Sequence, residues 1–296
     1  MKAMRHFPLL LFIFALGLPT SLSAQKAKQT VKQRVERVVT GEGLLRALKS
    51  NTRIVIPEGT EIMLTPSLEN EALCKLLKII EINTYAKDFS AFRNRPTLGW
   101  DDHFDGRELV IAGMRNVSIE GEGEGARIII TPRYSYVLRF VACTGIKLSN
   151  LTLGHTDEGY CEGGVVSFLS CDNVSIDHCD MFGCGTEGIQ AERTTNVVCD
   201  NSIIRECSYY IMTLSGCRKV HFTGCYFFLN KEFTLVNVKG SQEVAFTRCL
   251  FEENKGSLFS ISDCKVVLED CVVNHPEPSR GDTEMLTLKT TDWLEP

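Results

Sequence analysis

A short phrase recurs along the C-terminal two-thirds of the chain. Its copies include CTGIKLSNLTL, CDNVSIDHCDMF and CRKVHFTGCYFF, and the first apolar residue of each copy serves as an anchor. The anchors follow one another at steps of 29, 28, 23, 23, 24 and 22 residues, and they are Val117, Ile146, Val174, Val197, Val220, Val244 and Val266. A repeat of this length is typical of a solenoid, in which each unit packs only against its neighbours.

The pattern inside each unit predicts strands rather than helices. Apolar residues recur eight positions before the anchor, two after it and seven after it, as Val166, Ile176 and Met181 do around Val174. Each unit thus holds three short alternating runs, separated by corners rich in Gly, Asn, Asp and Ser. A leucine-rich repeat needs its own leucine and asparagine spacing, which is absent. We therefore expect an all-β fold, a parallel β-helix in which like residues stack about 4.8 Å apart.

The remaining segments divide the chain into five parts. Residues 1–24 combine basic residues, an apolar run and small residues near Ala24, which predicts a secretory signal peptide. No cysteine follows directly, so we expect no lipoprotein anchor, and no later run is apolar enough to span a membrane. We expect a flexible leader at 25–37, a cap with the first rungs at 38–110, the repeats at 111–273, and a C-terminal tail or closing cap at 274–296.

Several features of the flanking parts are predicted in more detail. Apolar spacing indicates a helix within 40–51 and a second at 67–81 that begins at Ser67, and these would cap the open end of the solenoid. Residues 83–107 are expected to be irregular. The units with extra length carry their extensions at 122–133 and 154–164, both assigned to the position after the second strand, where loops often form a working face.

Charge and cysteine content limit the function classes. Loss of residues 1–24 removes Lys2 and Arg5 and takes the net charge from −5 to −7, which argues against nucleic-acid partners. Most of the thirteen cysteines recur at corner positions, as Cys179, Cys225 and Cys249 do, five after their anchors. We interpret them as free, buried thiols, and their spacing does not suggest zinc. We expect a monomer.

The corner GHTDEGYCEGG at 154–164 is the first candidate site. It gathers several carboxylates and a histidine between glycines, and the next rung adds two more acids; the set is His155, Asp157, Glu158, Glu162, Asp180 and Glu187. Such a group can perform acid–base chemistry on a sugar, and Asp157, Glu158 and Glu162 can bind Ca²⁺. The alternative is a solvated polar loop whose glycines serve the turn.

Two further candidates are weaker. Asp177 and Asp200 lie three positions after consecutive anchors, so their carboxyl groups would be about 5 Å apart on one outer stripe, as in retaining glycosidases. The alternative is a charged face that keeps the protein soluble. In GWDDHFDG at 99–106, Trp100 would be a sugar platform beside acidic residues and His103, or else an anchor to the wall of the solenoid. The three Asn-X-Ser/Thr sequons fall on the strand pattern, so we interpret them as strand residues.

The tracts LTLGHTDEGYCEGGVVSF and CDNVSIDHCDMFGCGTEGIQAE resemble secreted bacterial right-handed parallel β-helix repeat proteins of the pectate-lyase-like superfamily. The resemblance covers about residues 38–273. It implies a right-handed coil and an exported protein of a group in which many members bind or act on polysaccharides. No catalytic set carries over, because the chain lacks both the paired Asp with a downstream Gly-His-Gly of polygalacturonases and the Arg and calcium-carboxylate pattern of pectate lyases.

Two functional hypotheses follow. The first is an exported module that binds a carbohydrate or another cell-surface ligand along a flat wall, without catalysis. The second is a polysaccharide lyase or glycoside hydrolase that uses the carboxylates of the 154–164 corner, with Ca²⁺ as a cofactor. A groove lined by aromatic rings and facing carboxylates would favour the enzyme, whereas a flat wall would favour the binding module.

Overall fold

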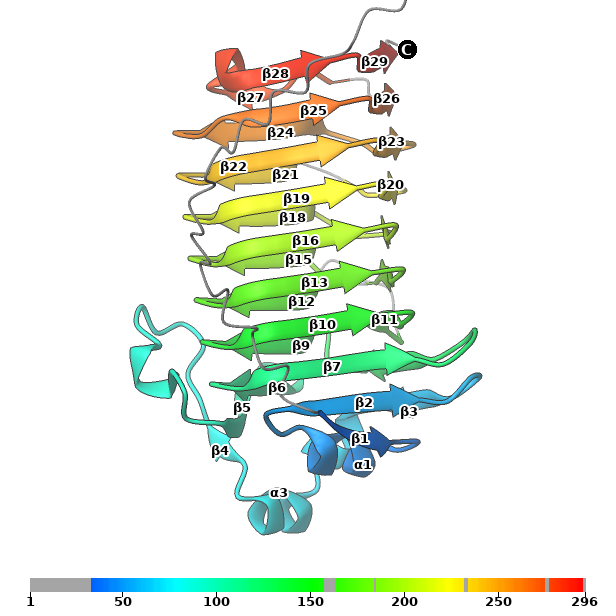
Figure 1. Ribbon diagram of the computed structural model, residues 1–296, viewed down its shortest axis with the longest axis vertical. Coiled ribbons are helices and arrows are strands. Elements are labelled where there is room, and N and C mark those ends of the chain that lie inside the picture. Colours follow the sequence, from blue (N-terminus) through cyan, green and yellow to red (C-terminus); the bar gives the residue numbers. More distant parts are fainter. Residues whose placement is uncertain (1–32, 157–162, 184, 232–233, 275–276, 295–296) are drawn as a thin grey trace, which may run out of the picture. The chain divides into compact units, whose positions relative to one another are not determined.

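The computed structural model describes residues 33–156, 163–183, 185–231, 234–274 and 277–294. Within them, three long sheets form the walls of a β-helix whose coils lie one above the next (Figure 1). The strands of sheet A are β1 (Arg34–Arg37), β2 (Thr52–Ile56), β7 (Arg115–Gly121), β10 (Thr144–Ser149), β13 (Asp172–Asp177), β16 (Thr195–Asp200), β19 (Arg218–Thr223), β22 (Gln242–Thr247), β25 (Val266–Glu269) and β28 (Leu286–Lys289).

Each coil continues from sheet A to sheet B and then to sheet C. Sheet B contains β3 (Glu61–Met63), β8 (Arg127–Ile130), β11 (Thr152–His155), β14 (Asp180–Phe182), β17 (Ile203–Arg205), β20 (Tyr226–Phe228), β23 (Leu250–Glu252), β26 (Val272–Asn274) and β29 (Asp292–Leu294). Sheet C contains β4 (Ile80–Glu81), β5 (Thr97–His103), β6 (Gly106–Ala112), β9 (Tyr136–Val141), β12 (Gly164–Leu169), β15 (Glu187–Glu192), β18 (Tyr210–Ser215), β21 (Thr234–Lys239), β24 (Ser257–Ser262) and β27 (Arg280–Gly281).

The strand register confirms the repeat that the sequence predicts. All seven anchors, from Val117 to Val266, lie opposite one another on successive strands of sheet A. Their side chains are buried together with the apolar residues of the other two sheets, and like stacks on like in the interior. Phe140 and Phe168 stack with ring centroids 5.4 Å apart, and Phe222 and Phe246 stack at 4.9 Å. The parallel β-helix is therefore the fold of the described residues.

The corners between sheets A and B turn on a single residue in the left-handed region. Asn150, His178 and Asn201 occupy this position in three consecutive coils, with φ of 53°, 51° and 48°. Asparagine tolerates this conformation better than most residues, which explains its recurrence in the phrase. The cysteines beside these corners behave as expected: the eleven in the described residues are free and buried. Burial raises the pKa of the Cys179 thiol to about 12, so it stays an unreactive thiol.

Short helices cap the N-terminal end, as predicted, but there are three in place of the two expected, and their boundaries differ. They are α1 (Gly41–Ala47), α2 (Thr65–Leu68) and α3 (Glu71–Leu77), and α1 buries Leu44 and Leu45 against the first coil. The predicted start of the second helix at Ser67 is wrong. Asn70 is the N-cap of α3, because its side chain accepts a hydrogen bond from the backbone N–H of Leu73 at 3.0 Å.

Three further expectations need correction. Residues 97–112, partly expected to be irregular, form the antiparallel hairpin β5–β6, with 3₁₀ turn Ser90–Phe92 before it. The extension at 122–133 does not lie after the second strand, since β8 begins at Arg127 and divides it between two corners. Residues 280–294, expected as part of a tail or closing cap outside the repeat, add another coil. In it β27, β28 and β29 pair with β24, β25 and β26, and the 3₁₀ turn Thr283–Met285 joins β27 to β28. The alternating residues of β28 place Leu286 and Leu288 opposite Val266 and Leu268, which the two prolines obscure in the sequence.

Candidate functional site

A cavity of about 400 Å³ lies on the outer face of sheet C. Its floor comes from β9 and β15, which contribute Tyr136, Arg139, Glu187 and Gln190, and one wall is the segment 84–87. His103, at the end of β5, also lines it. The hairpin β5–β6 joins sheet C beside β9, so the irregular part of the chain is held directly against the repeat array. The cavity therefore lies where the cap segment meets the regular coils.

A hydrogen-bonded row of side chains forms the middle of the floor. The register of sheet C aligns Arg139, Ser167 and Gln190 on three consecutive strands. The Arg139 guanidinium donates to Ser167 Oγ at 3.0 Å and to Gln190 Oε1 at 3.1 Å, and Ser167 Oγ donates to Gln190 Oε1 at 2.7 Å. These bonds hold Gln190 by its oxygen, so its amide N–H groups can donate to a ligand.

A buried ion pair fixes the arginine of this row. Glu108 on β6 is fully buried and accepts hydrogen bonds from the Arg139 guanidinium, one of them at 3.2 Å, and from the Tyr136 backbone N–H at 2.5 Å. Burial alone would raise the pKa of Glu108, but the charge of Arg139 and the nearby His103 lower it below its ordinary value. The Glu108 carboxylate, 3.6 Å from His103 Nε2, raises the pKa of that histidine in turn. The pair thus remains ionised inside the wall.

Tyr136 and Glu187 form the second pair of the floor, and a glycine makes it possible. They lie on either side of Gly164 in the register, and the Tyr136 hydroxyl donates to Glu187 Oε1. A Cβ at Gly164 would lie only 2.5 Å from the Tyr136 ring, so a side chain there would displace the tyrosine. Burial raises the pKa of Glu187 to about 7, because hydrogen bonds and the charge of Arg139 offset the lost hydration only in part. Its Oε2 has no hydrogen-bond partner among the described residues.

Exposed aromatic rings surround the mouth of the cavity. Tyr85 and Tyr134 line it, and Tyr85 is 76% exposed. Phe104, at the tip of the β5–β6 hairpin, is 91% exposed and meets Tyr134 edge to face, with centroids 5.7 Å apart. The segment that carries Tyr85 is anchored because the Thr84 backbone N–H donates to the buried Asp101 carboxylate at 2.8 Å. The rim therefore combines apolar ring faces with a polar floor.

Of the residues predicted from the 154–164 corner, Glu187 reaches this cavity. Asp157, Glu158 and Glu162 lie outside the described residues, and the Ca²⁺ site assigned to them stays a prediction. Gly163, the first residue described after them, lines the cavity. His155 is buried: its Nε2 lies 3.0 Å from the Ser135 carbonyl oxygen, and burial lowers its pKa, so the ring is neutral. Within the described ranges, no cluster of three or more His, Cys, Asp or Glu side chains could hold a metal ion.

The other predicted acids lie on different walls. Asp180 on sheet B pairs with Arg205 at 2.9 Å. Asp177 and Asp200 occupy neighbouring positions on sheet A, as the repeat spacing implies. Asp177 Oδ1 lies 2.8 Å from His178 Nδ1 and accepts a longer hydrogen bond from Asn201. None of these three lines the sheet C cavity.

The segment 99–106 contributes His103, which the sequence analysis named beside Trp100, and Phe104, but not Trp100 itself. Trp100 is half-buried against the core, with the Arg107 guanidinium 4.6 Å from its ring centroid, so it anchors the hairpin. His103, three residues after Trp100, lines the cavity, and Phe104, the next residue, lies at its rim. Sequence reasoning also missed Glu108, Arg139 and Tyr136. The signal that could have found them is a charged residue in each of two apolar runs. Glu108 directly precedes the run LVIA, and Arg139 lies within the run YVLRFV.

Comparison with known proteins agrees with the fold. The family model described as "Right handed beta helix region" matches residues 138–241. No curated protein is significantly similar to the chain in sequence. Among solved structures, a pectate lyase from Paenibacillus sp. is 12% identical, with a TM-score of 0.49, covering 83% of this chain and 72% of that one. A Bacillus subtilis pectate lyase variant is 11% identical with a TM-score of 0.48, covering 86% and 77%.

A surface adhesin of Streptococcus pneumoniae, PfbA, is 13% identical with a TM-score of 0.45, covering 82% of this chain and 70% of the adhesin. The matched region 138–241 begins on β9 and includes the strands β12, β15 and β18 of sheet C, so it contains most of the cavity floor. Its description supplies the handedness that the parallel register leaves open. The described residues therefore form a parallel β-helix, in which residues 138–241 match a right-handed β-helix region.

Proposed function

We propose that the chain is an exported module that binds a carbohydrate residue in the cavity on the outer face of sheet C. One observation carries the proposal: a polar floor with unused hydrogen-bonding groups lies under a rim of exposed aromatic rings. Export is part of the proposal because residues 1–24 have the pattern of a signal peptide. Among the described residues, no helix has the length and apolar character needed to cross a membrane.

The floor offers the groups that sugar hydroxyls require. Gln190 presents its amide N–H groups because its oxygen is already occupied by Arg139 and Ser167. Glu187 presents a buried Oε2 that has no hydrogen-bond partner among the described residues. A buried polar atom without a partner is costly, and a ligand hydroxyl would satisfy it. The fixed row therefore selects a ligand with several hydroxyl groups.

The rim supplies apolar contact for the faces of a sugar ring. Tyr85 and Tyr134 line the cavity and Phe104 packs against Tyr134, so rings with large exposed faces stand at its mouth. Aromatic rings lose little conformational entropy when they bind and bury a large area. The volume of about 400 Å³ lies in the range of small-molecule pockets, roughly 300–1,000 Å³. The cavity thus suits one or two sugar units of a longer chain.

Thermal unfolding with a panel of polysaccharides tests the proposal. Polygalacturonate, alginate, xylan and dextran serve as probes, each with Ca²⁺ and with EDTA. A ligand that binds only the folded state raises the unfolding midpoint. We expect a rise with at least one probe, and its loss in Gln190→Ala. Asn237→Ala is the matched control, because Asn237 is an amide on the same row of sheet C, beyond the cavity. No rise with any probe, or a rise retained in Gln190→Ala, would contradict the proposal.

A second candidate function is acid–base cleavage of the bound polysaccharide by Glu187. The observation that favours it is the pKa of this carboxyl group, about 7, which suits proton transfer at neutral pH. The polysaccharide that binds would be incubated with the protein, and both reducing and unsaturated chain ends would be measured. Catalysis predicts new ends with the wild type and none with Glu187→Gln, while binding persists. Unsaturated ends would indicate a lyase, and no new ends with the wild type would leave a binding module.

A further inference from the structure

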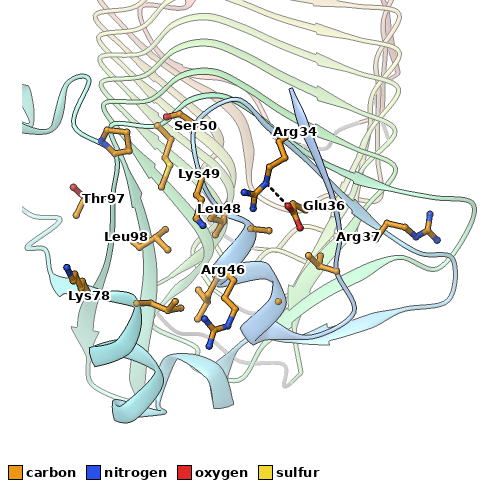
Figure 2. Close-up of a pocket in the computed structure, with 17 residues that line it drawn as sticks. Arg34, Glu36, Arg37, Arg46, Leu48, Lys49, Ser50, Lys78, Thr97 and Leu98 are labelled. Atoms are coloured by element: carbon orange, nitrogen blue, oxygen red, sulfur yellow. Dashed lines mark ion pairs between the residues drawn. The ribbon is translucent and has the colours of Figure 1, made fainter. Parts of the chain in front are cut away.

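A second and larger cavity lies at the N-terminal cap, away from the sheet C site. Its volume is about 850 Å³, and it is lined by residues of β1, of α1 and the turn after it, of the end of α3, and of the segment 96–98. Figure 2 shows Lys78, Thr97 and Leu98 on one side and Arg34 and Glu36 on the other, with Leu48 and Lys49 between them. None of its lining residues belongs to the proposed carbohydrate site.

The floor of this cap cavity is apolar. Leu45, Leu48 and Met114 line it and are almost fully buried in the core beneath. Leu77 and Leu98 are only partly buried and pack against that same core. A sugar would find few hydrogen-bonding groups on this floor. A hydrocarbon chain would be removed from water here, and the gain grows with each methylene group that is buried.

The rim of the cap cavity is cationic. Its charged residues are Arg34, Glu36, Arg37, Arg46, Lys49 and Lys78. The arginines have acidic partners: Arg34 pairs with Glu36, Arg37 with Glu122 and Arg46 with Glu42. Lys49 and Lys78 are exposed and form no ion pair within the described part of the chain. Two lysines beside an apolar floor are therefore available to an anionic group.

Exposed apolar side chains lie on the elements around this cavity. Val35 on β1 is 56% exposed and Val39, just after β1, is 59% exposed. Leu76 at the end of α3 is 64% exposed, and Ile80 on β4 is 48% exposed. These four flank lining residues in the sequence, on both sides of the cavity. None of the four lines the cavity itself, but they make the surface of the cap around it partly apolar.

We infer that the cap cavity binds a single-chain amphiphilic anion, with the hydrocarbon chain on the Leu45, Leu48, Leu77, Leu98 and Met114 floor and the anionic head beside Lys49 and Lys78. The two lysines supply charge complementarity, and the partly buried Leu77 and Leu98 supply most of the apolar area that the floor exposes. A carboxylate or a phosphate head would fit this rim, and both share the required charge. The inference is independent of the carbohydrate proposal, because the two cavities share no residue and either can fail alone.

Titration of the purified full chain with dodecanoate, below the concentration at which dodecanoate forms micelles, tests the inference. Calorimetry is expected to show saturable binding that strengthens from octanoate to decanoate to dodecanoate, and that weakens as salt rises because the charges are exposed. The variant Lys49→Ala/Lys78→Ala is expected to bind at least tenfold more weakly. Lys239→Ala/Lys265→Ala is the matched control, because both lysines are exposed on distant coils, and its affinity is expected to be unchanged.

Three outcomes would overturn the inference. The first is the absence of saturable binding to any of the three fatty carboxylates. The second is equal binding of dodecanoate and of dodecanol, since the rim would then contribute nothing. The third is binding only to vesicles of anionic lipid and not to the monomeric amphiphile, which would indicate a membrane surface instead. Dodecyl phosphate, compared with dodecanoate, distinguishes a phosphate head from a carboxylate head once binding is found.

Discussion

At the scale of single residues, Glu187 is the most unusual group of the sheet C cavity. It lies at the start of β15 with its carboxyl group buried beside Tyr136, in a space that exists because Gly164 has no side chain. The sequence singled out Glu187 only as one acid among several. Its distinction comes from burial and from the glycine one rung away, neither of which is visible in a single unit of the repeat.

Glu187→Gln is predicted to change the pH dependence of stability. The pKa of Glu187 is about 7 in the folded protein, above the ordinary value of 4.5, so the folded state holds its proton more tightly. The contribution of this group to the free energy of unfolding is fully present below about pH 4.5 and is lost as pH rises through 7. At pH 8 the loss lowers the free energy of unfolding by about 3 kcal/mol. Urea unfolding should show Glu187→Gln to be more stable than the wild type at pH 8 by up to that amount, and little changed at pH 4.5.

The half-exposed Glu192 on the same strand provides the control for this pH series. Glu192→Gln is expected to show no comparable gain at pH 8, because its side chain is hydrated and pairs with Arg193 at the surface. An equal stability difference between wild type and Glu187→Gln at both pH values would show that burial does not raise the pKa of Glu187. The interpretation of this carboxyl group as a proton-transfer group would then be lost as well.

At the scale of elements, the pairing of β6 with β9 attaches the cap segment to the repeat array. The register places Val110, Ile111 and Ala112 opposite Arg139, Phe140 and Val141, and the buried Glu108–Arg139 ion pair closes the same junction. Neither strand reveals this junction alone, since the two residues of the ion pair are 31 residues apart in sequence. The hairpin was partly predicted as an irregular excursion because its strands do not follow the phrase of the repeat.

Replacing one residue of this ion pair is predicted to lower the free energy of unfolding more than replacing both. Glu108→Ala leaves the Arg139 charge buried without its partner and should destabilise the protein by about 3–5 kcal/mol. The double variant Glu108→Leu/Arg139→Met should be substantially more stable than Glu108→Ala, because neither charge remains. Urea unfolding of the wild type, of Glu108→Leu, of Arg139→Met and of the double variant measures the coupling, and Glu108→Ala is measured beside them. Additive effects of the two single changes would show that the pair does not act as a unit.

The start of α3 provides a second prediction at the scale of elements. Asn70→Ala removes the hydrogen bond to the Leu73 N–H and should destabilise the cap by about 0.5–2 kcal/mol. Ser67→Ala, at the start expected from the sequence, should cost less, since α2 and α3 are separate helices there. Thermal unfolding of both variants compares the two positions. A larger loss of thermal stability in Ser67→Ala than in Asn70→Ala would show that the helix begins at Ser67.

At the scale of the whole molecule, the repeat made the coil predictable and left the site largely unpredicted. Seven anchors at regular steps determine strands, corners and register, because each coil must bury the same positions as its neighbours. The cavity depends on departures from that repeat: a charge in β9, a glycine in β12 and a hairpin before the array. Such departures have no period, so of the cavity residues the sequence singled out only Glu187, on the rung after the long 154–164 corner, and His103 in the segment 99–106.

The central claim is that a carbohydrate binds on the outer face of sheet C. Hydrogen–deuterium exchange with a bound oligosaccharide tests this claim most directly, because it shows which strands of sheets A, B and C the ligand protects. The oligosaccharide would be taken from whichever polysaccharide raises the unfolding midpoint. The account predicts slower exchange in β9, in β15 and in the segment 84–87, with β13, β16 and β19 of sheet A unchanged. Protection on sheet A around Asp177 and Asp200, with none at β9 and β15, would contradict the account. It would indicate that the carbohydrate binds beside these two carboxylates on sheet A instead.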